Sequence, residues 1–112
     1  MFEFRYGALA RACKLAAVLF FSLVATVQAE PLRVTIMGDS LVQGYGLAPE
    51  MGLVPQLEAW VKADGLDVAL LNAGVSGDTT RGGADRADWT LADNPDALVV
   101  ALGGNDVLRG LD

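Results

Sequence analysis

The chain has 112 residues, of which 53% are hydrophobic, and its formal net charge at neutral pH is −6. This length allows one small domain at most. The acidic balance argues against nucleic acid or an anionic membrane surface as a partner, because both attract basic proteins.

Residues 1–29 have the pattern of a secretory signal peptide. A basic segment with Arg5, Arg11 and Lys14 comes first, an almost purely apolar run spans residues 15–27, and Ala29 ends a small-residue cleavage site. The run is shorter than the about 20 residues of a membrane span, and an uncleaved signal anchor is the alternative. We therefore expect a periplasmic or secreted protein whose mature part is residues 30–112.

The residue types that most often bind metals are almost absent. The sequence contains no histidine, and its only cysteine, Cys13, lies within the predicted signal. The mature part therefore has no disulfide, no thiolate nucleophile and no zinc site built from cysteine or histidine. We predict no cofactor and no metal.

Three units of strand followed by helix or loop are predicted after the signal. The first has a β-branched strand at 33–37, a glycine-rich loop at 38–49, and a helix from Leu53 that carries Pro55 in its first turn and ends at Gly65. The second has a strand at 68–71, a loop at 72–79, and one helix reaching about residue 92, weakened near its start by two glycines. Its predicted cap is Asp78, Thr79 or Thr80.

The third unit starts after a turn at 94–96, with an apolar strand at 97–102 and a glycine-rich polar stretch at 103–106. Continuous apolar strands that alternate with helices indicate a parallel sheet covered on both faces. Ligands of such sheets bind beyond the carboxyl ends of the strands. All three polar, glycine-containing clusters fall at those ends.

Three residues at these ends suit acyl chemistry. Ser40 follows the first strand on a tight turn, Gly74 follows the second with an unobstructed N–H, and Asn105 offers a side-chain amide after the third. A serine surrounded by such donors, its own N–H included, makes a nucleophile with an oxyanion hole. Each also has a plainer interpretation: Ser40 as a helix cap, Gly74 as a turn glycine, and Asn105 as a residue that holds its own loop.

Other nucleotide and hydrolase motifs do not fit. The stretch from Gly38 reads G-x-S-x-V, so the nucleophile elbow of α/β-hydrolases is incomplete. No G-x-G-x-x-G follows a strand and no G-K-[ST] is present, which excludes the dinucleotide and P-loop signatures.

Three blocks in order resemble the GDSL, or SGNH, hydrolase family: Gly38-Asp39-Ser40-Leu41, the stretch from Asn72 to Thr79, and Gly103-Gly104-Asn105-Asp106. Within that family the chain is most similar to the thioesterase I, lysophospholipase L1 and arylesterase group. The resemblance covers essentially all of residues 30–112.

This resemblance implies a flavodoxin-like three-layer α/β/α fold with a parallel sheet. It implies Ser40 as nucleophile, with Ser40 N–H, Gly74 N–H and the Asn105 amide as oxyanion donors. The reaction is then hydrolysis of a small-molecule carboxylic ester or thioester through an acyl-enzyme, without metal or cofactor. Asp39 positions the nucleophile loop, whereas Asp78 and Asp106 structure loops.

The sequence departs from the family pattern in one respect. The family takes its triad acid and base from a late Asp-x-x-His block, and no histidine is present here. We interpret residues 30–112 as the N-terminal part of an SGNH domain, truncated after the third strand, which leaves that strand as an exposed edge and the chain nearly inactive alone. The alternatives are an inactive fragment or non-catalytic binding module and, from another class, a flavodoxin-like nucleotide binder.

Overall fold

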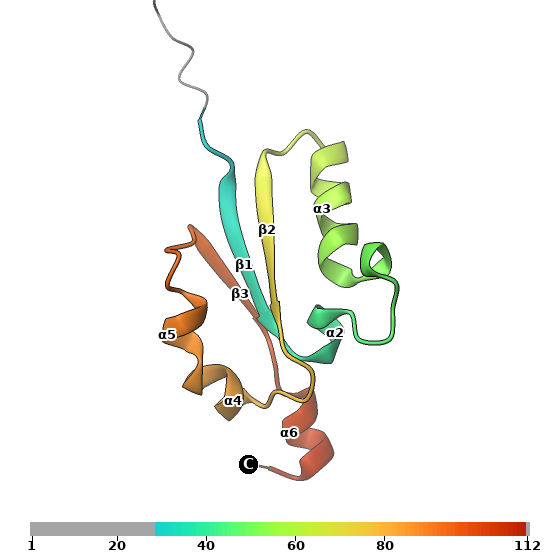
Figure 1. Cartoon of the computed structure of the whole chain (residues 1–112), viewed down its shortest axis with the longest axis vertical. Coiled ribbons are helices and arrows are strands. Elements are labelled where there is room, and N and C mark those ends of the chain that lie inside the picture. Colours follow the sequence, from blue (N-terminus) through green and yellow to red (C-terminus); the bar gives the residue numbers. More distant parts are fainter. Residues whose placement is uncertain (1–28, 112) are drawn as a thin grey trace, which may run out of the picture. The chain divides into compact units, whose positions relative to one another are not determined.

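The computed structural model describes residues 29–111, which include a compact unit that starts at Pro31. The predicted signal peptide lies outside the described residues, apart from Ala29. The unit contains a parallel sheet with strands β1 (Leu32–Gly38), β2 (Val68–Gly74) and β3 (Ala97–Ala101) (Figure 1). The strand order is β2-β1-β3, so the expected parallel α/β architecture is confirmed.

The register of the sheet aligns the carboxyl ends of its strands. Gly38, the last residue of β1, pairs with Gly74 of β2 on one side and with Ala101 of β3 on the other. Strand β2 continues three residues beyond the predicted end at residue 71, because its ladder with β1 persists to the Gly38–Gly74 pair. The segments that follow the three strands therefore start from one rim of the sheet.

The helices after β1 form largely as predicted. A short α2 (Ser40–Gln43) and a 3₁₀ turn (Pro49–Met51) precede α3 (Leu53–Ala63), which begins at the predicted residue and has Pro55 in its first turn. Gly65 follows α3 with a φ of 78°, a left-handed conformation that glycine adopts without a steric penalty.

The prediction of a single helix that reaches about residue 92 is wrong. The structure has α4 (Thr80–Asp85) and α5 (Ala87–Thr90), separated at Arg86, whose φ of −110° and ψ of 7° leave the helical region. The cap of α4 is Thr79, one of the predicted candidates, whose hydroxyl accepts from Gly82 N–H at 3.1 Å. Two glycines in six residues give α4 little intrinsic stability to continue through this break.

Helices pack on the two sides of β1, which places this central strand in the core. On one side, Ile36 of β1 forms a buried cluster with Val42 of α2 and Val54 of α3. On the other side, α4 lies close to Met37 of β1, because a Cβ added at Gly83 would be 3.5 Å from Met37 Sδ. Figure 1 shows α3 on one side of the sheet and α4 with α5 on the other. This agrees with the three-layer α/β/α arrangement expected from the family resemblance.

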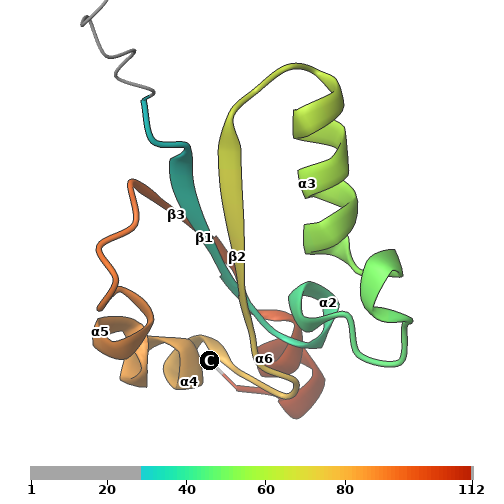
Figure 2. The same cartoon turned by 45° about the horizontal axis from the view of Figure 1, so that its top comes forward.

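Strand β3 is the exposed edge that the sequence predicts. Within residues 29–111 it pairs only with β1, and all five of its residues are exposed, Val100 to 59%. The expectation of a sheet covered on both faces is therefore wrong for β3, although it holds for β1. After β3, most of the glycine-rich polar stretch at 103–106 forms the start of helix α6 (Gly104–Arg109), and Figure 2 shows α6 and α2 at the same end of the sheet.

Among the residues that the structure describes, no helix has the length and apolar composition needed to cross a membrane.

Candidate functional site

Ser40 is the first residue of α2, immediately beyond the end of β1. The cap of this helix is Asp39, which is buried and whose carboxylate accepts from Leu41 N–H at 3.0 Å. The plainer interpretation of Ser40 as the helix cap is therefore wrong, because Asp39 has that role. The side chain of Ser40 is half-buried at the start of the helix, where Asp39 fixes the turn that carries it.

Gly74 is a glycine because the backbone of α2 lies against it. A Cβ at this position would overlap Gln43 N and would lie 2.8 Å from both Gln43 Cα and Val42 C. Its φ is not positive, so the interpretation of Gly74 as an ordinary turn glycine is wrong. The close approach joins the end of β2 to the helix that begins with Ser40, so the two predicted site residues belong to segments that are in contact.

Asn72 joins the same two segments and was not predicted as a site residue. Its Nδ2 donates to Val42 O of α2 at 2.9 Å, and its Oδ1 accepts from Gly74 N–H at 2.9 Å. The N-x-G spacing is typical of such an Asx turn, and that was the available signal. Because Asn72 already accepts the Gly74 N–H, a ligand oxygen must share or replace this bond.

Asn105 lies in the first turn of α6, four residues beyond the end of β3. Its Nδ2 donates to Asp78 O at 2.8 Å, across 27 positions of sequence. The interpretation that Asn105 holds its own loop is therefore wrong, since it holds the loop after β2. An amide nitrogen carries two hydrogens, and this bond uses one of them.

Asp78 and Asp106 occupy structural positions, as the family resemblance implies. Asp78 Oδ2 accepts from Arg86 Nε at 2.7 Å, in an ion pair whose side chains are both only 17% exposed. The Asp106 carboxylate accepts from Thr80 N–H at 2.9 Å and from Thr80 Oγ1 at 2.7 Å. Asp106 thereby connects α6 to the start of α4.

Two hydrogen bonds lower the pKa of Asp106 below its ordinary value. The bond from the Thr80 hydroxyl has the larger effect, and the bond from Thr80 N–H has the next largest. A carboxyl whose pKa is depressed in the folded state stabilises the fold above its unfolded pKa of about 3.9, and this contribution is lost as the pH falls through the folded pKa.

We therefore expect Asp106→Asn to lower the urea midpoint of unfolding at pH 7, with a difference from wild type that shrinks as the pH falls below about 4. Asp85→Asn is the matched control, because Asp85 pairs with Arg81 on the exposed surface of α4. Urea titrations at pH 7, 4 and 3 measure the effect. A difference of the same size at all three pH values would contradict it.

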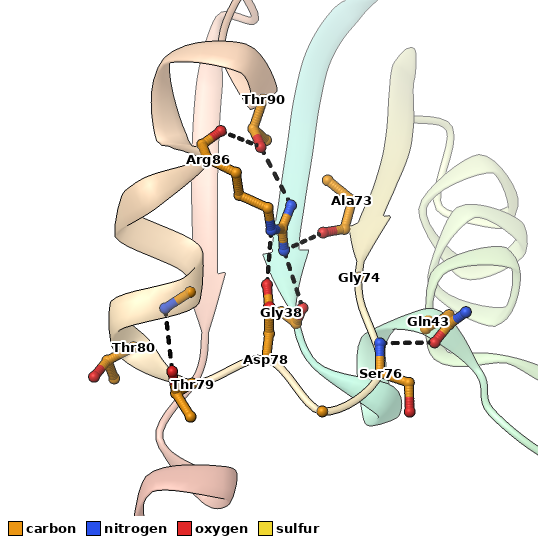
Figure 3. Close-up of polar contacts among 12 residues, drawn as sticks. Gly38, Gln43, Ala73, Gly74, Ser76, Asp78, Thr79, Thr80, Arg86 and Thr90 are labelled. Atoms are coloured by element: carbon orange, nitrogen blue, oxygen red, sulfur yellow. Dashed lines mark hydrogen bonds and ion pairs between the residues drawn. The ribbon is translucent and has the colours of Figure 1, made fainter. Parts of the chain in front are cut away.

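Two other side chains hold the loop that follows β2, and neither was predicted as a site residue. Gln43 Oε1 of α2 accepts from Ser76 N–H at 2.9 Å, and Arg109 Nη2 of α6 donates to Gly77 O at 2.8 Å (Figure 3 shows the first of these bonds). Within the described residues, no three acidic, histidine or cysteine side chains cluster in a way that would hold a metal ion.

Comparison with known proteins gives concordant matches. The model of the GDSL-like lipase/acylhydrolase family matches residues 36–112. Esterase TesA of Pseudomonas aeruginosa is 41% identical over 77% of this chain and 43% of its own length, and an arylesterase of Vibrio mimicus is 39% identical over 86% and 48%. The solved structure of AlinE4, an SGNH-hydrolase family esterase, is 41% identical and superposes with a TM-score of 0.70. This match covers 76% of the present chain and 47% of the AlinE4 chain. The chain spans about half the length of these relatives.

Proposed function

Because the chain belongs to the GDSL-like lipase/acylhydrolase family, we propose that it supplies the nucleophile and the oxyanion donors for hydrolysis of carboxylic esters or thioesters. One observation carries this proposal: the register aligns Gly38, Gly74 and Ala101 at one rim. Ser40 lies two residues beyond the first of these, and Asn105 lies four residues beyond the last.

In the proposed reaction the Ser40 hydroxyl loses its proton to a base, and its oxygen bonds to the carbonyl carbon of the ester. The carbonyl oxygen becomes an oxyanion, which the N–H groups of Ser40 and Gly74 and the Asn105 amide stabilise. The alcohol or thiol then leaves with a proton, and water converts the acyl-serine into a carboxylic acid. No step requires a metal or a cofactor.

The base is the part of this reaction that the sequence does not contain. A serine hydroxyl is a weak nucleophile without a neighbouring base, and the sequence has no imidazole to fill that role. Our proposal therefore assigns these 112 residues the nucleophile and oxyanion part of the site. Imidazole added to the solution offers a direct way to test that part.

We expect imidazole to accelerate hydrolysis of p-nitrophenyl acetate by the chain, with saturation in the ester, because it replaces the missing general base. Ser40→Ala is expected to lose all of the rate that exceeds the reaction of free imidazole with the ester. The release of p-nitrophenol gives the rate, and mass spectrometry after an acid quench locates the acetyl group on the peptide with Ser40.

Ser76→Ala is the matched control for this experiment. It makes the same chemical change at an exposed residue, and the bond of Ser76 to Gln43 uses its backbone N–H. We expect this variant to keep the wild-type rate. Equal rates for wild type and Ser40→Ala at every imidazole concentration would contradict the proposed nucleophile.

A non-catalytic binding role is the second candidate, and the lack of histidine in the sequence favours it. The same experiment separates the two functions. A binding module would bind the ester without forming an acetylated Ser40, whereas the hydrolase forms the adduct.

We also propose that the protein is exported and acts in the periplasm or outside the cell. The support for this is the signal pattern of residues 1–29, with its basic segment, apolar run and small-residue cleavage site.

A further inference from the structure

Helix α6 carries Asn105, a predicted oxyanion donor, and its apolar side chains do little to hold it in place. Val107 and Leu108 are 81% and 83% exposed, and Leu111, just beyond the helix, is 51% exposed. The joint to β3 contains Gly103, whose φ of 115° is open to glycine, so the strand by itself does not fix the direction of the helix. The position of Asn105 therefore depends on the polar contacts of α6.

The hydrogen bond of Asn105 fixes the direction of its amide. Nδ2 donates one hydrogen to Asp78 O at 2.8 Å, so the other hydrogen can serve an oxyanion. Asp78 is a firm partner, because its carboxylate accepts from Arg86 Nε at 2.7 Å in a pair whose side chains are both only 17% exposed. Arg86 also donates to Gly38 O at 3.3 Å and to Ala73 O at 2.9 Å (Figure 3). The Asn105 amide is thereby connected to the ends of β1 and β2.

Two further side chains of α6, Asp106 and Arg109, bind the polypeptide on either side of Asp78, and we call them the anchor residues. The Asp106 carboxylate accepts from Thr80 N–H at 2.9 Å and from Thr80 Oγ1 at 2.7 Å, and Arg109 Nη2 donates to Gly77 O at 2.8 Å. A Cβ added at Gly77 would lie 3.4 Å from Arg109 Nη2, so the guanidinium lies directly against this backbone. The anchor residues thus hold α6 against residues 77–80.

Helix α6 also lies close to the turn that carries the nucleophile. A Cβ added at Gly104 would lie 3.4 Å from Asp39 Oδ2, and Asp39 Oδ1 caps α2 by accepting from Leu41 N–H. Gly104 is the residue before Asn105, and Asp39 is the residue before Ser40. A change in the direction of α6 would therefore move the Asn105 amide relative to Ser40.

We propose that Asp106 and Arg109 are positioning residues that hold α6 so that the second hydrogen of the Asn105 amide points at the oxyanion formed at Ser40. This inference rests on the proposed function. The anchor residues touch no reacting atom and act only through Asn105. Because exposed polar contacts of this kind contribute little to stability, a large effect on kcat would distinguish positioning from a purely structural role.

The first test compares Arg109→Met with Arg81→Met in the full 112-residue chain. Arg81 is the matched control, because it is an exposed arginine that pairs with Asp85 on α4. We expect Arg109→Met to lower the Ser40-dependent kcat for p-nitrophenyl acetate in imidazole by about 10-fold, with KM changed less than about twofold, since a displacement of about 1 Å costs about 100-fold and two of the three contacts remain. Arg81→Met is expected to keep both constants.

Two further variants sharpen this comparison. Arg109→Lys is expected to restore kcat to within about threefold of wild type, because an ammonium can supply the one hydrogen that Gly77 O accepts. Thr80→Val removes the hydroxyl bond to Asp106 without changing α6, and it is expected to lower kcat in the same way as Arg109→Met. Urea titrations identify any variant that unfolds, and if Arg109→Met does so, Thr80→Val decides.

A double-mutant cycle tests whether the anchor residues act through Asn105. In the Asn105→Ala background, Arg109→Met is expected to change kcat by less than about twofold, because the amide that it positions is gone. An equal loss in both backgrounds would contradict the inference.

A measurement that is independent of turnover is ¹⁵N relaxation of the Asn105 side-chain amide. In wild type we expect this amide to be as rigid as the backbone, and in Arg109→Met we expect it to move on the picosecond to nanosecond timescale. Arg109→Lys and Arg81→Met are expected to keep it rigid.

The outcomes separate this inference from the proposed function. If wild type shows no Ser40-dependent hydrolysis, the proposed function fails, and the relaxation data still show whether the anchor residues hold Asn105. If hydrolysis depends on Ser40 but folded Arg109→Met and Thr80→Val keep the wild-type kcat, the positioning role is overturned. A loss of kcat with an unchanged Asn105 amide overturns it as well.

Discussion

Gly74→Ala is expected to displace α2 from the end of β2 and to lower the stability of the fold. The added Cβ would overlap Gln43 N and lie 2.8 Å from two further backbone atoms, which have no side-chain rotamer to relieve the contact. Overpacking of this kind costs about 1–3 kcal/mol. Because α2 begins with Ser40, the same displacement is expected to abolish the Ser40-dependent hydrolysis.

Gly52→Ala is the matched control for Gly74→Ala. Gly52 has a φ of −70°, and a Cβ there would meet its nearest atom, Pro55 Cδ, at an ordinary 3.6 Å. Because Gly52 caps α3, we expect this variant to lose about 1 kcal/mol at most. Urea unfolding gives the free energies of both variants, and equal losses would contradict the proposed close contact of α2 with β2.

Asn105→Ala is expected to lower the imidazole-dependent hydrolysis by about 100- to 1,000-fold, which is the usual cost of removing one oxyanion donor. The variant also loses the bond from Asn105 Nδ2 to Asp78 O, and this is expected to cost only about 1 kcal/mol of stability. The effect on the rate should therefore exceed the effect on the fold by a wide margin.

Val107→Ala is the control on the same helix, because Val107 is 81% exposed on α6. It is expected to change neither the rate nor the urea midpoint. The comparison is made as kcat/KM with p-nitrophenyl acetate at a fixed imidazole concentration. A loss below about threefold for Asn105→Ala would remove Asn105 from the oxyanion hole.

The rim of the site is predictable from the sequence because it depends on local patterns. Apolar strands that end in glycine-rich polar clusters indicate where a parallel sheet stops, and the structure places the ends of all three strands in register. Ser40, Gly74 and Asn105 follow from those three positions. Their catalytic roles remain predictions, which the experiments on Ser40 and Asn105 test.

The contacts that hold these strand ends in place are not predictable in the same way. Arg86 lies 48 positions from Gly38, and nothing in the residues around it indicates that its side chain turns back under the sheet. The break between α4 and α5 was missed for a related reason, since the sequence from Thr80 to Thr90 has no proline to mark it. Such features depend on contacts between segments that are distant in sequence.

The bond between Gly74 N–H and Asn72 Oδ1 bears on how the proposed site would discriminate between substrate and transition state. In the free protein a neutral amide oxygen occupies this donor at 2.9 Å. An ester carbonyl is an acceptor no stronger than that amide, so it gains little by replacing it. An oxyanion is a stronger acceptor and gains much more. Asn72 would thus compete with the substrate for the Gly74 N–H. The bound ester hardly displaces Asn72, whereas the tetrahedral intermediate displaces it readily. Binding energy is then used in the transition state of acyl transfer, where it lowers the barrier.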